Sequence, residues 1–185
     1  MKLIVFSGLP GAGKSAVAES IAAKLGIPIF AKDWLEAPLL KSGLVSREQL
    51  GVIGYELLTT LARRQLTFSQ SVILDSVAST ASIRSIWQSL ADEFGATRFV
   101  IECVCSDEAV HRQRLAERRR AISNWPELDW SEVERVRSYF EPWSEDRLVL
   151  DSLEPLSINL ERAIAYVQRP LPNSSLLATR YTSGE

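Results

Sequence analysis

Residues 8–15 read Gly8-Leu9-Pro10-Gly11-Ala12-Gly13-Lys14-Ser15, which matches the pattern G-x-x-x-x-G-K-[ST]. An apolar run, Lys2–Ser7, precedes this loop and an amphipathic run, Lys14–Leu25, follows it, so a strand and a helix are expected on either side. Glycines let the backbone turn its amides toward a phosphate, and the N-terminus of the helix adds its positive dipole end. We expect Lys14 to contact the β- and γ-phosphates of a nucleotide and Ser15 to hold Mg²⁺. The expected nucleotide-binding residues of the loop are Gly8, Gly11, Ala12, Gly13, Lys14 and Ser15.

From this loop outward, short apolar runs alternate with longer amphipathic runs, which predicts an α/β fold with a parallel sheet covered by helices on both faces. The runs at residues 3–6 and 72–74 are continuously apolar, as strands buried on both faces should be. The expected strands are residues 2–7, 27–31, 72–75, 98–105 and 147–150. The expected helices are residues 14–25, a stretch that breaks around 41–43, 47–66, 82–94, 107–120, 131–140 and 157–167.

The chain has 185 residues, which suits one domain with a lid. We expect a nucleotide-binding domain over residues 1–168, with a mobile lid at about 118–140, and a C-terminal tail over 169–185. In the tail, Leu176 and Leu177 could dock elsewhere. Lys and Arg total 21 and Asp and Glu total 23, so the charge argues against an extended nucleic-acid-binding surface and against a polybasic membrane protein.

The expected compartment follows from what the sequence lacks. No apolar run approaches the roughly 20 residues that span a bilayer, and the N-terminal apolar run stops too early for a signal peptide. The two cysteines, Cys103 and Cys105, lie two apart on one expected strand, in poor geometry for a disulfide. We therefore expect two small thiols in a cytoplasmic, reduced protein with no membrane partner.

Two aspartates follow expected strands, at the edge where ligands gather in parallel sheets. Asp75 ends the third strand and is expected to hold Mg²⁺ beside the phosphate-binding loop, or alternatively to cap the next helix. Asp33 follows the second strand, where its carboxylate could accept the proton of a substrate hydroxyl, with Lys32 keeping it ionised. Alternatively, Asp33 caps the helix that begins at Trp34. Trp34 itself could be an aromatic platform for the acceptor or a core residue.

Residues 107–120 carry five arginines against three acids. On a helix, Arg114 and Arg118 share one face, and both guanidinium groups could close over a triphosphate as a lid arrives. The alternative is a solvated helix face paired with neighbouring glutamates. Arg119 and Arg120 are as consistent with a surface position as with a site, and His111, the only histidine, is typical of a surface residue.

The loop Gly8–Ser15, Asp33, Asp75 and Arg114-x-x-x-Arg118 follow successive strands in an arrangement that resembles the small phosphate-loop kinases. The likeness is strongest to the AAA-domain-named family of small ATP-binding proteins, which is grouped with polynucleotide 5′-kinases, zeta-type toxin kinases and chloramphenicol phosphotransferases. It covers most of residues 1–168 and implies a three-layer fold with a five-stranded sheet in the order 2-3-1-4-5. It also implies ATP and Mg²⁺ as cofactors, Asp33 as the general base and Arg118 as a lid arginine on the nucleotide.

The function expected first is an ATP-dependent kinase that acts on a hydroxyl of a small molecule, with Lys14, Asp33 and Arg118 as its catalytic residues. Its mechanism would consist mostly of positioning and charge neutralisation. We expect the segments around residues 34–66 and 78–86 to choose the acceptor by the shape of the pocket.

Two other functions are weighed against it. An ATP-binding regulatory or toxin-like module with a protein partner would use the tail, together with Trp125, Trp130 and Trp143, as an interface. A nucleic-acid end kinase needs a basic groove beside Asp33, but residues 34–55 hold only Lys41 and Arg47 as positive charges. The sequence therefore favours a small-molecule acceptor over a nucleic acid.

Overall fold

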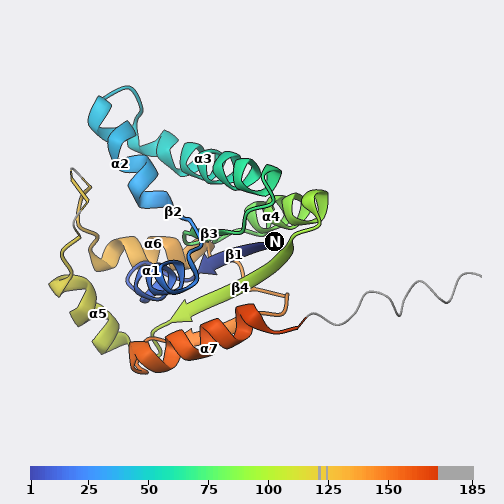
Figure 1. Ribbon diagram of the computed structural model, residues 1–185. Coiled ribbons are helices and arrows are strands. Elements are labelled where there is room, and N and C mark those ends of the chain that lie inside the picture. The colour runs from blue at the N-terminus through green and yellow to red at the C-terminus, as the bar shows by residue number, and fades with distance from the viewer. Residues whose placement is uncertain (121, 124, 171–185) are drawn as a thin grey trace, which may run out of the picture.

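Five parallel strands form one sheet in the order β2-β3-β1-β4-β5, which confirms the expected fold class and order (Figure 1). The computed structural model describes residues 1–120, 122–123 and 125–170. The strands are β1 (Lys2–Ser7), β2 (Ile29–Ala31), β3 (Val72–Asp75), β4 (Thr97–Val104) and β5 (Leu148–Asp151). β2 begins at Ile29 rather than at residue 27 because the Ile27 amide closes the preceding helix on Ala22 and Pro28 has no N–H to donate.

Within the described residues, seven helices connect and cover these strands: α1 (Lys14–Leu25), α2 (Lys32–Ser42), α3 (Arg47–Thr67), α4 (Ala81–Phe94), α5 (Glu108–Glu117), α6 (Trp130–Tyr139) and α7 (Leu156–Gln168). α5 ends at Glu117, so the prediction of a helix up to Arg120 is wrong. Arg118 takes an extended conformation (φ −61°, ψ 134°) and the chain leaves the helix there. No helix in the described ranges is long and apolar enough to cross a membrane.

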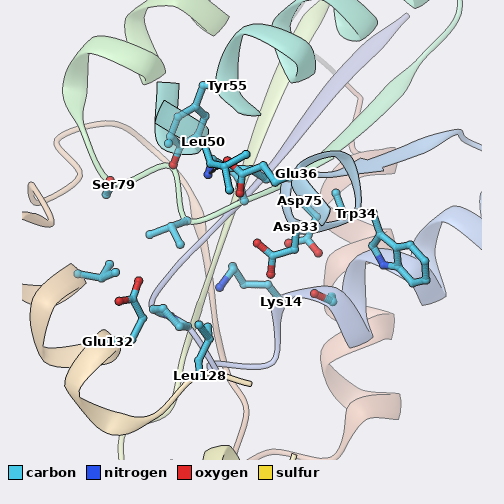
Figure 2. Close-up of a pocket in the computed structure, with 18 of the residues that line it drawn as sticks. Lys14, Asp33, Trp34, Glu36, Leu50, Tyr55, Asp75, Ser79, Leu128 and Glu132 are labelled. Carbon is cyan, nitrogen blue, oxygen red and sulfur yellow. Dashed lines mark hydrogen bonds and ion pairs between the residues drawn. The ribbon is translucent and has the colours of Figure 1, made fainter. Parts of the chain in front are cut away.

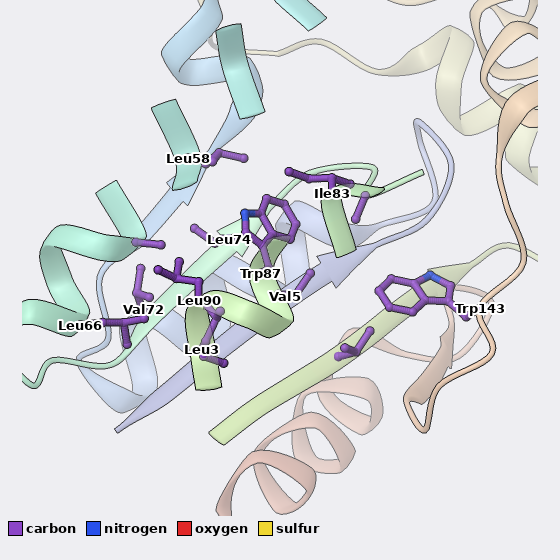
Figure 3. Close-up of a cluster of buried hydrophobic side chains, with 14 residues drawn as sticks. Leu3, Val5, Leu58, Leu66, Val72, Leu74, Ile83, Trp87, Leu90 and Trp143 are labelled. Atoms are coloured by element: carbon purple, nitrogen blue, oxygen red, sulfur yellow. The ribbon is translucent and has the colours of Figure 1, made fainter. Parts of the chain in front are cut away.

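Each face of the sheet carries its own buried core. Along β1, Leu3 and Val5 face a core that α3 and α4 complete, whereas Ile4 and Phe6 face a core completed by α1 and α7. In Figure 1, α3 and α4 lie on one side of the sheet and α7 on the other. Figure 3 shows the first core, in which Trp87 packs among the aliphatic side chains. Both faces are apolar because both are covered, as the continuous apolar runs predicted.

The strand register brings the chemistry-bearing residues to one edge. Asp75, the last residue of β3, pairs with Phe6 of β1 and with Ala31 of β2. The loop after β1, the first turn of α2 and the carboxylate of Asp75 therefore lie together at the carboxyl end of the sheet. This is the edge at which parallel α/β sheets bind ligands.

Trp143 belongs to the core rather than to an exposed interface. It is buried, and its Nε1 donates a hydrogen bond of 3.0 Å to Ser7 Oγ at the end of β1. The guanidinium of Arg84 lies over the same ring, 3.9 Å from a ring centroid. Trp143 is therefore not part of the exposed interface that was suggested for the tryptophans. The tail residues Leu176 and Leu177, suggested for the same interface, lie outside the described residues.

Candidate functional site

The loop between β1 and α1 wraps around its own lysine. Gly8, Gly11 and Gly13 take positive φ angles of 128°, 82° and 90°, which glycine adopts at little cost. Lys14 is buried, and its Nζ donates a hydrogen bond of 2.8 Å to the carbonyl of Leu9 within the same loop. The ammonium group is thereby held over the concave side of the loop.

Lys14 and Asp75 form the charged centre of the site. Burial lowers the pKa of Lys14 and raises the pKa of Asp75, and the opposite charge of each residue opposes the shift of the other. The Ser15 side chain, through a hydrogen bond, also lowers the pKa of Asp75. Asp75 is not a helix cap, because α4 begins at Ala81 with Thr80 as its N-cap. Its carboxylate instead lies beside Lys14 and Ser15 at the end of β3.

Asp33 lies in the first turn of α2, where the N-cap is Ala31. The alternative of a capping aspartate is therefore wrong. The expected pairing with Lys32 is also wrong, because the Lys32 ammonium binds Glu36 at 2.5 Å, beneath the Tyr55 ring. Asp33 instead pairs with the guanidinium of Arg120, which reaches it from the segment after α5. In Figure 2, the Asp33 carboxylate lies beside the Lys14 side chain, and its negative charge acts against the lowering of the Lys14 pKa by burial.

The arginines of residues 114–120 separate in space because α5 ends early. Arg114 Nη1 donates a hydrogen bond of 2.7 Å to the carbonyl of Ser152, in the loop after β5. Arg118 instead lines a small cavity over the phosphate-binding loop, so the two side chains do not share a helix face. The prediction for Arg120 was incomplete, because its side chain is only 5% exposed and contacts Asp33.

Two adjoining cavities open at this edge of the sheet. The smaller has a volume of about 150 Å³ and is lined by Gly11, Gly13, Lys14, Ser15, Ala16 and Arg118. The larger has a volume of about 1150 Å³ and extends past Asp33 to α2, α3 and α6 (Figure 2). Lys14 lines both cavities, whereas Asp33 lines only the larger one.

The walls of the larger cavity come from the segments in which acceptor-selecting residues were expected. Trp34 lines it and is 53% exposed, so the alternative of a core residue is wrong. Tyr55 on α3 lines the opposite wall, and burial raises its pKa to about 12. Glu36 is buried beside it, and burial raises the pKa of its carboxyl group. The cavity thus combines aromatic surface with a few placed polar groups, as small-molecule sites do.

His111 is buried against the phosphate-binding loop, so its expected surface position is wrong. Its Nε2 donates a hydrogen bond of 2.8 Å to the carbonyl of Pro10, and its ring meets Trp130 of α6 edge-on at 5.1 Å. The helical spacing could have indicated this position, because His111 lies four residues before the apolar Leu115 and thus on the same helix face. These are the two buried residues of α5. Trp130 is likewise engaged in this contact.

Comparison with known proteins places the chain in a family. The family model described as AAA domain matches residues 3–143, and no curated protein matches the chain. A putative kinase from Chloroflexus aurantiacus J-10-fl has a TM-score of 0.70 at 23% identity, with 90% of this chain and 98% of that chain covered. A gluconokinase from Sinorhizobium meliloti 1021 has a TM-score of 0.64 at 22% identity, with 90% of this chain and 91% of that chain covered. An APS kinase from Mycobacterium tuberculosis in complex with AMPPNP and APS has a TM-score of 0.65 at 20% identity, with 91% of this chain and 98% of that chain covered. The chain belongs to the AAA domain family and has the fold of these phosphate-loop kinases.

Proposed function

We propose that the protein is an ATP-dependent kinase that transfers the γ-phosphoryl group to a hydroxyl of a small molecule. One observation carries the proposal: the Asp33 carboxylate lies beside Lys14, which lines both the small cavity over the phosphate-binding loop and the larger cavity (Figure 2). A cation and a carboxylate in this arrangement suit a phosphoryl group on one side and its acceptor on the other.

The residues of the small cavity fit a triphosphate with its metal ion. The positive φ angles at Gly11 and Gly13 suit a backbone that turns its amides toward an anion, and the buried ammonium of Lys14 and the guanidinium of Arg118 add charge. Ser15 and Asp75 would hold Mg²⁺. Among the described residues no group of three or more His, Cys, Asp and Glu is placed to hold a metal ion.

Bound ATP with Mg²⁺ supplies the transferable phosphoryl group and neutralises part of its charge. Lys14 and Arg118 orient that group, and the carboxylate of Asp33 accepts the proton of the acceptor hydroxyl. The hydroxyl oxygen forms a bond to the γ-phosphorus while the bond from that phosphorus to the β-phosphate oxygen breaks. The products are ADP and a phosphate ester. Residues 118–140 act as the lid, and the two free cysteines support a cytoplasmic location.

The test compares two variants with a matched control. Lys14→Ala and Asp33→Asn should both abolish ADP release that depends on added hydroxyl compounds, while Asp33→Asn should keep nearly full ATP binding. Asp92→Asn removes an exposed carboxylate on α4 and should leave both quantities unchanged. Full transfer by Asp33→Asn would exclude Asp33 as the base. ATP consumption that no acceptor stimulates would instead favour the ATP-binding regulatory module.

A further inference from the structure

Buried polar atoms without a partner gather in the larger cavity. Ser76 Oγ, Arg120 Nε and Trp125 Nε1 are buried, have no hydrogen-bond partner among the described residues, and belong to residues that line this cavity. A buried donor left unsatisfied destabilises the folded state, so such atoms call for an explanation in a native structure. Their convergence on one cavity indicates a ligand that accepts hydrogen bonds there.

Arg120 is the strongest of these three donors because its fork is only partly used. Its bond to Asp33 is made by Nη1, which leaves the side-on edge formed by Nε and Nη2. No described residue accepts a hydrogen bond from Nε. Nε–H and one Nη–H point in the same direction along this edge and together match the two oxygens of a carboxylate or a phosphate.

The arginines divide between the two cavities. Arg118 lines both, whereas Arg120 lines only the larger one, where it meets Asp33. Two of the acids in the larger cavity already have cationic partners: Glu36 pairs with Lys32 at 2.5 Å and Glu132 with Arg135 at 2.6 Å. Arg120 therefore lies on the acceptor side of the site rather than in the small cavity that would hold the nucleotide phosphates.

We propose that Arg120 recognises the acceptor, and that the acceptor is a small anionic alcohol bearing a carboxylate or a phosphate close to its reacting hydroxyl. This inference rests on the proposed kinase function. One guanidinium would contact Asp33 through Nη1 and the oxyanion through Nε and Nη2, so the hydroxyl at Asp33 and the oxyanion must lie near each other on the acceptor. Trp125 Nε1 and Ser76 Oγ supply further donors in the same cavity.

The test measures acceptor binding with the nucleotide site already filled. The full chain is saturated with Mg²⁺ and AMPPNP, and calorimetry then follows D-glycerate, gluconate and glycerol 3-phosphate, each against its neutral counterpart, glycerol or sorbitol. We expect the anionic probes to bind at least about tenfold more tightly than the neutral ones, the effect of one charge-assisted hydrogen bond. Arg120→Gln and Arg120→Lys should both lose this preference, because neither side chain offers the side-on edge.

Arg120→Lys keeps a cation beside Asp33 and thus separates a loss of acceptor recognition from a loss of folding. AMPPNP affinity and the melting temperature report whether the variant is folded. Arg162→Gln is the matched control, because Arg162 lies on α7, donates to the carbonyl of Val149 and is among the lining residues of neither cavity; its anion affinity should stay within about twofold of the parent. Equal binding of neutral and anionic probes, absence of binding by every probe, or parental binding by both Arg120 variants would overturn the inference. Failure to bind AMPPNP would instead refute the proposed function.

Discussion

Replacing His111 should destabilise the fold at the phosphate-binding loop. Its imidazole is buried and donates from Nε2 to the Pro10 carbonyl at 2.8 Å, and the edge of the ring packs on Trp130. His111→Phe keeps an aromatic ring beside Trp130 but cannot donate, whereas His111→Gln keeps a donor near the position of Nε2. The pair of variants therefore isolates the hydrogen bond from the packing.

The magnitude follows from the buried acceptor that His111→Phe leaves behind. An unsatisfied buried carbonyl costs about 1–3 kcal/mol, which in a chain of this size lowers the melting temperature by roughly 2–4 °C per kcal/mol. We expect urea denaturation to show a loss of about 2 kcal/mol for His111→Phe and recovery of about half of it in His111→Gln. A stability of His111→Phe equal to that of the parent would refute the reasoning.

The same bond carries a dependence on pH. Burial lowers the pKa of His111, with the charges of Arg137 and Lys14 acting in the same direction and the Pro10 carbonyl and Glu108 opposing them. The native state thus favours the neutral imidazole of His111. The stability that the neutral ring contributes is fully present above the pKa of histidine in the unfolded chain, about 6.5, and is lost as the pH falls below that value. The stability difference between the parent and His111→Phe should shrink from pH 8 to pH 5. A difference that stays constant with pH would contradict this assignment.

Two further substitutions test the frame around the site. A Cβ at Gly8 would lie 2.1 Å from the carbonyl oxygen of Cys103, so Gly8→Ala should lower the free energy of unfolding in urea by more than about 3 kcal/mol. Gly43 also has a positive φ, 68°, but a Cβ there would meet nothing within 4 Å. Gly43→Ala should therefore lower the same free energy by about 1 kcal/mol. Equal losses would show that the contact is relieved. Arg84 donates to four backbone carbonyls and stacks on Trp143, so Arg84→Met should cost about 3 kcal/mol or more, and a loss below about 1 kcal/mol would mean that water replaces these bonds.

The sheet and the phosphate-binding loop could be predicted because their signals are local. A glycine-rich loop ending in Lys14-Ser15 specifies its own backbone, and continuous apolar runs such as residues 3–6 and 72–74 predict buried strands. The register then needs no further information: once the strands are parallel, Asp75 and the residues after Ala31 must meet at one edge. Lys14, Ser15 and Asp75 therefore lie close together in the structure, while their roles stay predictions.

The contacts that escaped prediction join distant segments. Asp33 and Arg120 are 87 residues apart, and Pro10 and His111 are 101 residues apart. The first contact depends on where the chain passes after α5 and the second on how α5 packs against the phosphate-binding loop, and no local pattern fixes either. For Lys32 the error was local. Asp33, its neighbour in the sequence, was expected to be its partner, but the actual partner is Glu36, which lies four residues on and therefore on the same helix face.

The early end of α5 explains why three consecutive arginines serve different purposes. In a helix, Arg118 and Arg120 would point about 160° apart, so one of them would face away from the cavities. Extended backbone at Arg118 instead lets both side chains reach the cavity walls, since residues two apart share a side in an extended chain. Arg119 turns back and donates to the Ala116 carbonyl, while Glu127 accepts the Arg120 amide at 2.8 Å. These bonds replace part of the hydrogen bonding that a longer helix would have provided. The end of the helix at this point therefore lets the guanidinium groups of Arg118 and Arg120 both reach the site.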